Sequence, residues 1–327
     1  MAVRAVRGSG IVGAMPDNHP SPVTLTTIEP KTLRSSGDTL ELLANNWPPA
    51  ERQSQAATLI AGLHSGKDGE FVILEARRAG QLVGAALAQA LPGRAAVVWA
   101  PQLVGGEEKE IGLLLLAELQ RRLAAAEIHV AQSLVIAENA AEAELFQTAG
   151  YQLVGELVYM ACEAARFPRL PPAITLTTEA YTRADDARLA RIIDATYERT
   201  LDCPLVNGLR ETSDVLDGYR AVGQPRPDLW QFLRQESEDV GCLLLAAHAA
   251  QRQWELVYLG LAPAARGRGL GLALTQLALW MAGREGAQRM VLAVDSANRP
   301  ALDLYQTAGF VPCDSRRAWV LSLRSAS

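Results

Sequence analysis

A short arginine- and glycine-rich segment has the residue types that bind an anion. Arg266-Gly-Arg-Gly-Leu-Gly271 lies between an apolar, strand-like run that ends at Leu261 and an apolar segment of helical length, 270–283. Glycines let a ligand approach the backbone, and the free N–H groups and dipole at a helix start attract negative charge. Arginine side chains add charge-assisted contacts to phosphate. The segment therefore predicts an anion cradle, with a solvent-exposed glycine-rich turn as the alternative.

The glycine spacing excludes two common nucleotide motifs. Walker A requires Lys-Ser/Thr after its last glycine, and the dinucleotide fingerprint requires Gly-x-Gly-x-x-Gly, whereas Gly267, Gly269 and Gly271 are spaced by two. Arg266, Gly269 and Gly271 instead match the pattern Arg/Gln-x-x-Gly-x-Gly/Ala. In this respect the segment resembles the acyl-CoA pyrophosphate loop of the GNAT acetyltransferases.

A second GNAT-like feature follows the first. The apolar run 290–294 predicts a strand, Asn298 comes after it, and a predicted helix ends with Tyr305 shortly before Gly309-Phe310. The resemblance implies an acetyl-CoA site and assigns Asn298 to the cofactor arm, although an asparagine here is also a typical helix cap. The residues that the resemblance assigns to the cofactor are Leu259, Gly260, Leu261, Arg266, Gly267, Arg268, Gly269, Leu270, Gly271 and Asn298.

Acyl transfer from a thioester to an amine needs donors for the carbonyl oxygen, a base for the amine and an acid for the leaving thiolate. The resemblance implies that backbone N–H groups near Leu261 are the donors. It also implies that Tyr305 is the acid, because a phenol with a pKa of about 10 is protonated at neutral pH. Glu255, six residues before Leu261, is the candidate base. The alternatives are a core aromatic for Tyr305 and the solvent-facing residue of a strand for Glu255.

Length and composition bound the class of protein. The chain has 327 residues, enough for two domains, with 49% apolar and 20% charged residues. A net charge of −5 argues against binding to nucleic acid or an anionic membrane, and no run is long enough to span a bilayer. The four cysteines and four histidines are scattered, so we expect no metal and free thiols in a reducing cytoplasm.

The chain contains an internal repeat. Phe146-Gln-Thr-Ala-Gly-Tyr151 recurs as Tyr305-Gln-Thr-Ala-Gly-Phe310, an offset of 159 that also relates Gly112 to Gly271 and Asn139 to Asn298. We predict two tandem α/β copies of the GNAT fold, each with a mixed, mostly antiparallel sheet flanked by helices. The expected divisions are a disordered tail at 1–22 with Met15 as a second possible start, a first domain at 23–165, a Pro-rich linker at 166–172 and a second domain at 173–327.

The first copy has lost the features that the second retains. The cradle aligns with Glu107-Glu-Lys-Glu-Ile-Gly112, in which carboxylates replace the groups that would face phosphate. Phe146 replaces the tyrosine, and Ala96 stands at the offset position of Glu255. We predict that the first copy is catalytically silent and that its acids are a solvated helix N-terminus.

The expected elements follow from apolar periodicity and turn residues. In the first copy they are strands at 71–75, 81–90, 95–99 and 134–137 and a helix at 112–126; in the second they are helices at 183–200 and 214–220 and strands at 229–234, 241–248, 254–261, 290–294 and 318–323.

The acceptor pocket is expected between the first helix and the second strand of the second copy, by family resemblance. Its candidate contacts are Asp202, Cys203, Asn207, Asp217 and Tyr219, with ordinary loop polarity as the alternative for each. A degenerate first copy followed by an intact second copy resembles the mycothiol synthases. The sequence thus predicts an acetyl-CoA-dependent N-acetyltransferase for a small-molecule or protein amine. The alternative is a non-catalytic acyl-CoA sensor, and the oligomeric state is open.

Overall fold

The computed structural model describes residues 22–28, 37–49, 52–53, 55–57, 60, 71–105, 109–224 and 226–324. Except for Pro22, the predicted tail lies outside these residues, as do Glu107 and Glu108 of the degenerate loop. The N-terminal half contains β1 (Val23–Ile28), α1 (Gly37–Leu43), β2 (Phe71–Arg78), β3 (Gln81–Leu91), β4 (Ala95–Val98), β5 (Gln102–Leu103), α3 (Lys109–Ala125), β6 (Val130–Ile136), α4 (Ala140–Thr148) and β7 (Gln152–Glu163). The C-terminal half contains β8 (Thr177–Ala180), α5 (Asp186–Tyr197), α6 (Thr212–Arg220), β9 (Trp230–Gln235), β10 (Glu238–His248), β11 (Gln253–Leu261), α7 (Leu270–Arg284), β12 (Arg289–Asp295), α8 (Arg299–Thr307) and β13 (Val311–Ser322).

The internal repeat is confirmed at the level of whole elements. β6 and β12, α4 and α8, and β7 and β13 each begin and end 159 residues apart. The caps repeat as well, because Asn139 accepts a hydrogen bond from the Glu142 amide at the start of α4 and Asn298 accepts one from the Ala301 amide at the start of α8. The chain is a tandem of two α/β units, as predicted.

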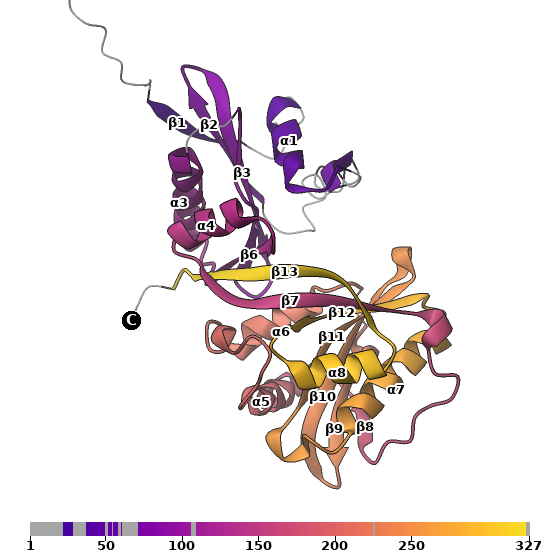
Figure 1. Ribbon diagram of the computed structural model, residues 1–327. Helices are drawn as coiled ribbons and strands as arrows, with labels where there is room; N and C mark the ends of the chain where they lie inside the picture. Colours follow the sequence, from indigo (N-terminus) through magenta and orange to yellow (C-terminus); the bar gives the residue numbers. More distant parts are fainter. Residues whose placement is uncertain are drawn as a thin grey trace, which may run out of the picture.

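The described strands form one 13-stranded sheet that runs through both halves, in the order β1-β2-β3-β4-β6-β13-β7-β12-β11-β10-β9-β8, with β5 paired to β3 (Figure 1). Most neighbours are antiparallel; β4 with β6 and β11 with β12 are the parallel pairs. Helices cover the sheet: α3 packs on β2 and β3, and α5 packs on β10 and β11. The predicted mixed, mostly antiparallel sheet flanked by helices is confirmed.

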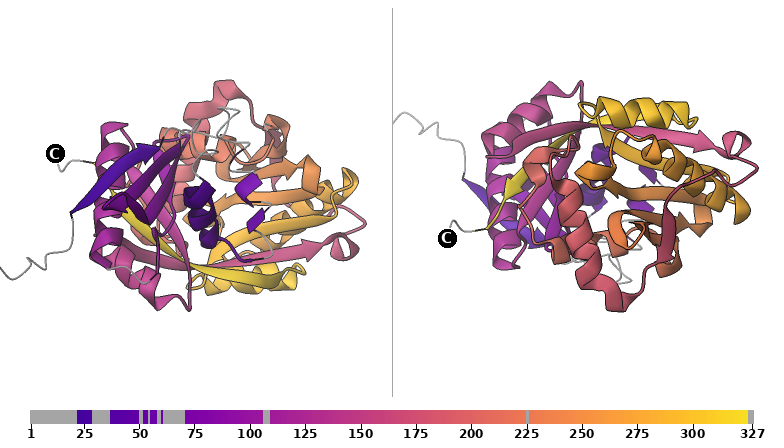
Figure 2. Two further views of the ribbon diagram at one scale, coloured as in Figure 1. Left: turned by 90° about the horizontal axis from the view of Figure 1, so that it is seen from above. Right: turned by 90° about the horizontal axis from the view of Figure 1, so that it is seen from below.

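The two halves exchange their last strands. β7 follows α4 but lies between β12 and β13, and β13 follows α8 but lies between β6 and β7 (Figure 2). In the pairing of β7 with β13, Gln152 lies opposite Val320 and Ala161 lies opposite Val311. The 159-residue offset converts each of these pairs into the other, so the central strands obey a local two-fold relation. Each half thereby covers a sheet edge that the other would leave unpaired.

Most predicted elements lie where the sequence placed them, and the errors have physical reasons. The helix predicted at 183–200 begins with a 3₁₀ turn and ends at Tyr197. The last strand begins at Val311 and not at 318, because its polar first part pairs with β7 from the other half. β6 likewise begins at Val130, four residues before the predicted start, where it pairs with β13. Pairing partners distant in sequence leave little local signal.

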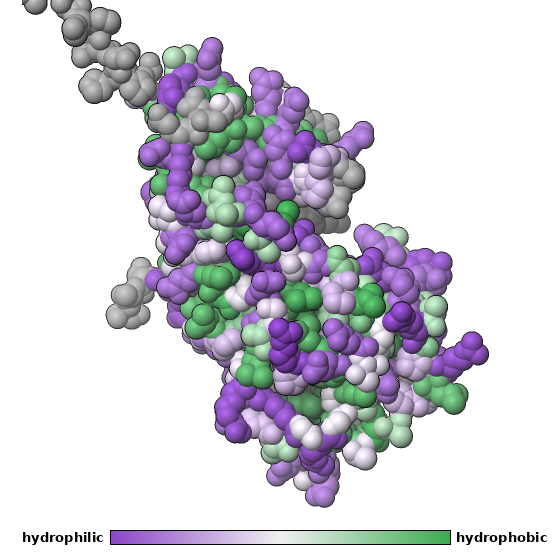
Figure 3. Space-filling model, viewed as in Figure 1, coloured by the Kyte–Doolittle hydropathy of each residue, from purple (hydrophilic) through white to green (hydrophobic). Residues whose placement is uncertain are grey.

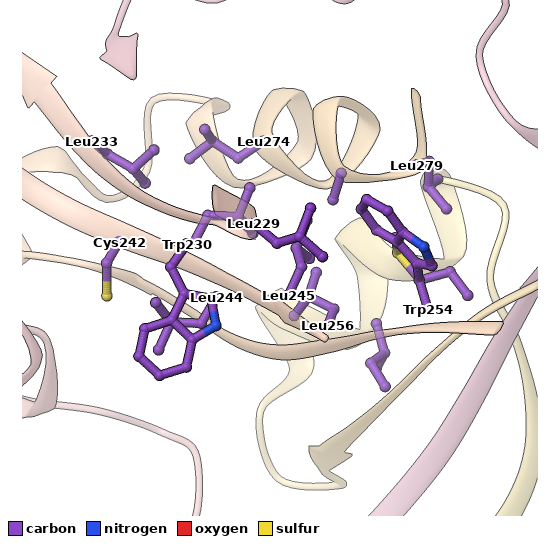
Figure 4. Close-up of a cluster of buried hydrophobic side chains, with 14 of the residues drawn as sticks. Leu229, Trp230, Leu233, Cys242, Leu244, Leu245, Trp254, Leu256, Leu274 and Leu279 are labelled. Atoms are coloured by element: carbon purple, nitrogen blue, oxygen red, sulfur yellow. The ribbon is translucent and has the colours of Figure 1, made fainter. Parts of the chain in front are cut away.

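The larger hydrophobic core lies in the C-terminal half between the sheet and α7. Trp254 and Leu256 of β11 pack there with Leu274 and Leu279 of α7 (Figure 4). A second core in the N-terminal half includes Phe146 and several leucines of α3. On the face shown in Figure 3, hydrophilic and hydrophobic residues are interspersed. No helix among the described residues is both long enough and apolar enough to cross a membrane.

Candidate active site

The parallel pair β11–β12 separates after three residues and opens a gap in the sheet. Gln253, Trp254 and Glu255 pair with Arg289, Met290 and Val291, and no pairing between the two strands follows. On its other edge β11 remains paired with β10 as far as Leu261, with a bulge next to Leu256 that bends the strand. The backbone of Leu259, Gly260 and Leu261 therefore faces the gap on one side, where its polar groups are free of strand partners.

Gly260 allows α5 to approach β11. A Cβ atom at this position would lie 2.7 Å from Oγ1 of Thr196 and 2.7 Å from the Tyr258 ring. Both distances are shorter than a van der Waals contact, so a side chain here would push α5 away from the gap. Gly260 is therefore needed for steric reasons. Gly267 and Gly269, in the loop that follows, differ in this respect, because they have positive φ angles and open space around them.

The predicted anion cradle has the backbone of a helix N-terminus open to a ligand. Gly267 and Gly269 have φ angles of +71° and +76°, and an added Cβ at either would meet nothing within 4 Å. Gly269 is the N-cap of α7 and has no side chain to accept a hydrogen bond. The first amides of α7, those of Leu270, Gly271 and the next residue, have no carbonyl partner inside the helix. They are available to an anion.

Gly271 has a different role in the same loop. An added Cβ would lie 3.2 Å from Leu304 of α8, and the repeat-related Gly112 has a Cβ position 3.3 Å from Leu145 of α4. This glycine therefore sets the close packing of the two helices in both halves. That shared role explains why Gly112 persists in a loop that has otherwise become acidic.

The guanidinium of Arg266 binds carbonyl oxygens and does not lie at the open side of the cradle. It donates hydrogen bonds to the carbonyls of Leu261 (2.8 Å), Thr196 (2.7 Å), Glu198 (2.9 Å) and Arg199 (3.1 Å). These contacts cap the C-terminal end of α5 and tie it to the end of β11. Arg266 thus holds the loop in place, and the phosphate contact expected of its side chain stays a prediction.

Arg268 is the second arginine of the predicted cradle. Its guanidinium donates a hydrogen bond to Oε1 of Gln235 (2.8 Å) at the exposed end of β9. This contact is exposed and uses one of the five N–H donors of the guanidinium. Arg268 can therefore still face an anion at the cradle, as the sequence predicts.

Tyr305 of α8 is buried in the larger hydrophobic core of the C-terminal half. Its ring packs edge-to-face on Phe310 at 5.8 Å between ring centroids, and 7% of its surface is exposed. In the N-terminal half Phe146 and Tyr151 make the same contact at 5.0 Å with the two ring types exchanged. Burial, with a smaller effect of Asp202, raises the pKa of Tyr305 well above its ordinary value. The phenol therefore stays protonated, as a proton donor must.

Asp202 and Cys203 lie beside Asn298 and form a polar cluster at the end of β12. Oδ1 of Asp202 accepts a hydrogen bond from the Asp295 amide (2.8 Å), and Oδ2 of Asp295 accepts one from the Cys203 amide (3.0 Å). Loss of water around its carboxyl raises the pKa of Asp202, while a hydrogen bond from Asn298 opposes this shift. Loss of water also raises the pKa of the Cys203 thiol to about 12, so it is no ready nucleophile.

The N-terminal half contributes a wall to this cluster. A Cβ at Gly155 of β7 would lie 2.9 Å from Oδ2 of Asp295 and 3.0 Å from Sγ of Cys203. Sequence reasoning missed both Asp295 and Gly155. The position of Asp295 directly after an apolar strand was a usable signal, whereas the contact with Gly155 follows only from the exchange of β7.

Glu255 lies at the point where β11 and β12 separate. The alternation of the strand directs it away from Trp254 and Leu256, which pack against α7, and so toward the opposite face of the sheet. Its Oε2 atom lies 3.0 Å from Nε2 of His248, and the two side chains are 34% and 25% exposed. His248 was missed by sequence reasoning. The strand register corrects one equivalence. Glu255 pairs with Val291, and the repeat-related Gln132 pairs with Val97, so Val97 and not Ala96 is the equivalent of Glu255 in the first half. The chain from this position to the repeat-related Gly112 or Gly271 is one residue longer in the second half.

The remaining predicted acceptor residues do not come together. Tyr219 stacks on Tyr258 with 5.6 Å between ring centroids, and its hydroxyl lies 3.3 Å from that of Tyr197. Tyr219 also lines a surface pocket together with Trp230 and Arg220. The volume of this pocket, including its solvent-open entrance, is about 480 Å³. Asp217 is 56% exposed and pairs with Arg220, and Asn207 is exposed on the loop that precedes α6.

The equivalent region of the N-terminal half has a different character. Lys109, at the start of α3, pairs with Glu144 at 2.7 Å, and Glu110 is the acid of the first helical turn. Phe146 is fully buried and has no hydroxyl. In the described part of this loop, the cation at the position of Arg268 is Lys109, which is paired with Glu144, and Glu110 stands in place of Gly269. The described residues of the whole chain include no group of three or more His, Cys, Asp or Glu that could hold a metal ion.

Comparisons with known proteins agree with this geometry. Residues 193–310 match the family model for the acetyltransferase (GNAT) family. A mycothiol acetyltransferase from Streptomyces scabiei (strain 87.22) is 31% identical over 212 residues, which cover 63% of this chain and 64% of the relative. A mycothiol acetyltransferase from Corynebacterium glutamicum matches over 28% of its length. The chain thus spans less than two thirds of these curated relatives.

Two solved structures share the fold over nearly the whole chain. One is a GCN5-related N-acetyltransferase from Sphaerobacter thermophilus, with a TM-score of 0.60, 18% identity and coverage of 94% of this chain and 98% of that one. The other is a tandem GNAT protein from the clavulanic acid biosynthesis pathway, with a TM-score of 0.54, 14% identity and coverage of 94% and 100%.

Proposed function

Because residues 193–310 match the acetyltransferase (GNAT) family model, we propose that the chain transfers an acetyl group from acetyl-CoA to an amine at one site, in its C-terminal half. The observation that carries this proposal is the gap between β11 and β12 together with the free amides at the start of α7, in the half that contains the buried Tyr305. A pyrophosphate bound at these amides would direct the pantetheine arm along the open edge of Leu259, Gly260 and Leu261.

The proposed reaction divides its protons between two residues. Glu255 takes a proton from the ammonium of the acceptor, directly or through a water molecule, and the free amine attacks the thioester carbonyl. Backbone amides next to the gap stabilise the oxyanion. When the carbon–sulfur bond breaks, Tyr305 gives its proton to the CoA thiolate. The nitrogen of the new amide loses its second proton, which restores the Tyr305 phenol, and the proton taken up by Glu255 leaves to solvent.

The acceptor is proposed by class only. The negative side chains of Asp202, Asp295 and Glu255 near the gap favour a positively charged amine. The polar cluster around Asp202 includes Gly155 of β7, so we propose that the N-terminal half shapes the acceptor side of the site without binding acetyl-CoA itself. The names of the curated relatives make a mycothiol precursor that lacks its acetyl group the first acceptor to test.

The test is release of free CoA thiol from acetyl-CoA in the presence of that precursor, of small primary amines and of lysine-containing peptides. The proposal expects amine-dependent thiol release with at least one of these acceptors and an acetylated amine as the product. Binding of acetyl-CoA without turnover of any amine would contradict it and favour a non-catalytic acyl-CoA sensor.

A further inference from the structure

Among the described side chains, His248 is the one that lies within hydrogen-bonding distance of the Glu255 carboxylate. The two residues flank the hairpin that joins β10 to β11, in which Ala246 lies opposite Glu255 and Gln253 lies opposite His248. They are thus diagonal neighbours on one face of the sheet. Their Nε2 and Oε2 atoms are 3.0 Å apart, within hydrogen-bonding distance.

Glu255 and His248 lie at the point where the gap between β11 and β12 begins. Glu255 is the last residue of β11 that pairs with β12, so its backbone is fixed by strands on both sides while its side chain stands at the start of the gap. Its carboxylate has four lone-pair sites, and a donor at one oxygen leaves the other free for an amine or a water molecule.

The other charged groups around the pair belong to three strands. Tyr159 of β7 is close enough to Glu255 for the carboxylate to contribute to the raised pKa of that phenol, whose main cause is burial. Arg316 and Asp314 of β13 lie near Tyr159 and form an ion pair at 2.6 Å. Arg289, two residues before Val291 on β12, pairs with Glu163 at 3.4 Å. These two arginines already face carboxylates, and the hydrogen bond that the structure gives the Glu255 carboxylate is the one with His248.

We propose that His248 is a positioning residue for the base of the acetyl-transfer reaction: its Nε2–H group donates to Oε2 of Glu255, which aims the other carboxylate oxygen at the gap. This inference depends on the proposed function, because Glu255 acts as a base only if an amine is acetylated.

The test compares His248→Leu with His248→Gln in the full-length chain. Glutamine places an N–H donor near the position of Nε2, whereas leucine fills similar space without a donor. His129→Leu is the control, since it removes a half-buried histidine that lies 3.6 Å from Asp214 in the region where α6 approaches the first half. The measurement is kcat and KM at neutral pH, with acetyl-CoA and the best amine of the panel above, together with thermal unfolding of each variant.

We expect His248→Leu to lower kcat by about 10-fold at neutral pH, with little change in the KM for acetyl-CoA. His248→Gln restores most of the rate, and His129→Leu changes neither value. In a Glu255→Gln background His248→Leu has no further effect on kcat. A merely structural role would lower stability and would lower the rate in that background as well.

The same rates separate failure of this inference from failure of the proposed function. Turnover by the wild type that is unchanged in His248→Leu, or that His248→Gln lowers as much as His248→Leu does, overturns the inference and leaves the proposed function standing. Absence of turnover with every amine overturns the proposed function and this assignment with it.

Discussion

The Nη2 atom of Arg266 donates a 2.7 Å hydrogen bond to the carbonyl oxygen of Thr196, and this contact joins the predicted anion cradle to the end of α5. Thr196 also lies against Gly260 and shares a 2.6 Å hydrogen bond with the Tyr258 hydroxyl. The segment that carries Asp202 and Cys203 begins a few residues after Thr196. One arginine therefore aligns the cradle, the open edge of β11 and the polar cluster.

Replacement of Arg266 is expected to destabilise the C-terminal half. Arg266→Met removes four hydrogen bonds to carbonyls, and we expect a loss of about 2–3 kcal/mol in the free energy of unfolding. Arg268→Met removes one exposed contact and should change it by less than about 0.5 kcal/mol. Urea unfolding of both variants checks this; equal effects would contradict the supporting role of Arg266.

Tyr305→Phe is expected to lower kcat for acetyl transfer by about 100-fold with little change in the KM for acetyl-CoA, because it removes the proton donor and keeps the ring. Tyr151→Phe is the matched control, since Tyr151 makes the equivalent ring contact in the N-terminal half. Steady-state kinetics of both variants decide the matter. Full activity in Tyr305→Phe would leave this tyrosine as a core aromatic, as Phe146 is.

Stability is expected to fall steeply in alkaline solution. Burial raises the pKa values of Tyr219 and Tyr258 above that of a free tyrosine, with smaller effects of neighbouring groups. A phenol with a raised folded-state pKa contributes its full stability below the unfolded value of about 10 and loses it as the pH rises toward the folded value. Each tyrosine should therefore cost about 1.4 kcal/mol per pH unit above about pH 10.

The measurement is urea unfolding at a series of pH values for the wild type and for Tyr219→Phe and Tyr258→Phe. Each phenylalanine should make the alkaline decline shallower while leaving its onset in place. An alkaline decline of the same slope in all three proteins would show that these tyrosines do not titrate with unfolding.

The halves are expected to need each other to fold. Chains that end at 168 or begin at 169 would leave the partners of β7 and β13 absent and expose long sheet edges. Each half expressed alone should aggregate, and the two expressed together should form a one-to-one complex that contains both exchanged strands. Gel filtration and circular dichroism of the separate and combined halves test this. A monomeric, folded C-terminal half would contradict the exchange.

Local pattern was enough to predict the repeat, the helices that follow the gap and the position of the cradle. The recurrence of Gln-Thr-Ala-Gly and of an asparagine cap fixed equivalent elements to the residue. The exchange of β7 and β13 could not be predicted in this way, because an exchanged strand buries the same faces and makes the same backbone hydrogen bonds as one that stays in its own half.

The site was predictable in part for a related reason. Tyr305 and Asn298 occupy recognisable motif positions, whereas His248 becomes a neighbour of Glu255 only through the register of a hairpin, and Gly155 becomes a neighbour of Asp295 only through the exchanged strand. Arg266 shows the converse. Its type and position predict a phosphate contact, whereas in the structure its guanidinium donates hydrogen bonds to carbonyl oxygens at the end of α5.

The most direct measurement is isothermal titration of acetyl-CoA into the wild-type chain, Gly269→Glu and Gly286→Glu. Gly269 and Gly286 have φ angles of +76° and +78° with open space beyond each, so the two substitutions carry a similar conformational cost, and Gly286 lies at the far end of α7. We predict one site per chain, lost in Gly269→Glu and retained in Gly286→Glu. Two sites per chain, or binding that survives Gly269→Glu, would contradict the assignment of the single acetyl-CoA site to the amino end of α7.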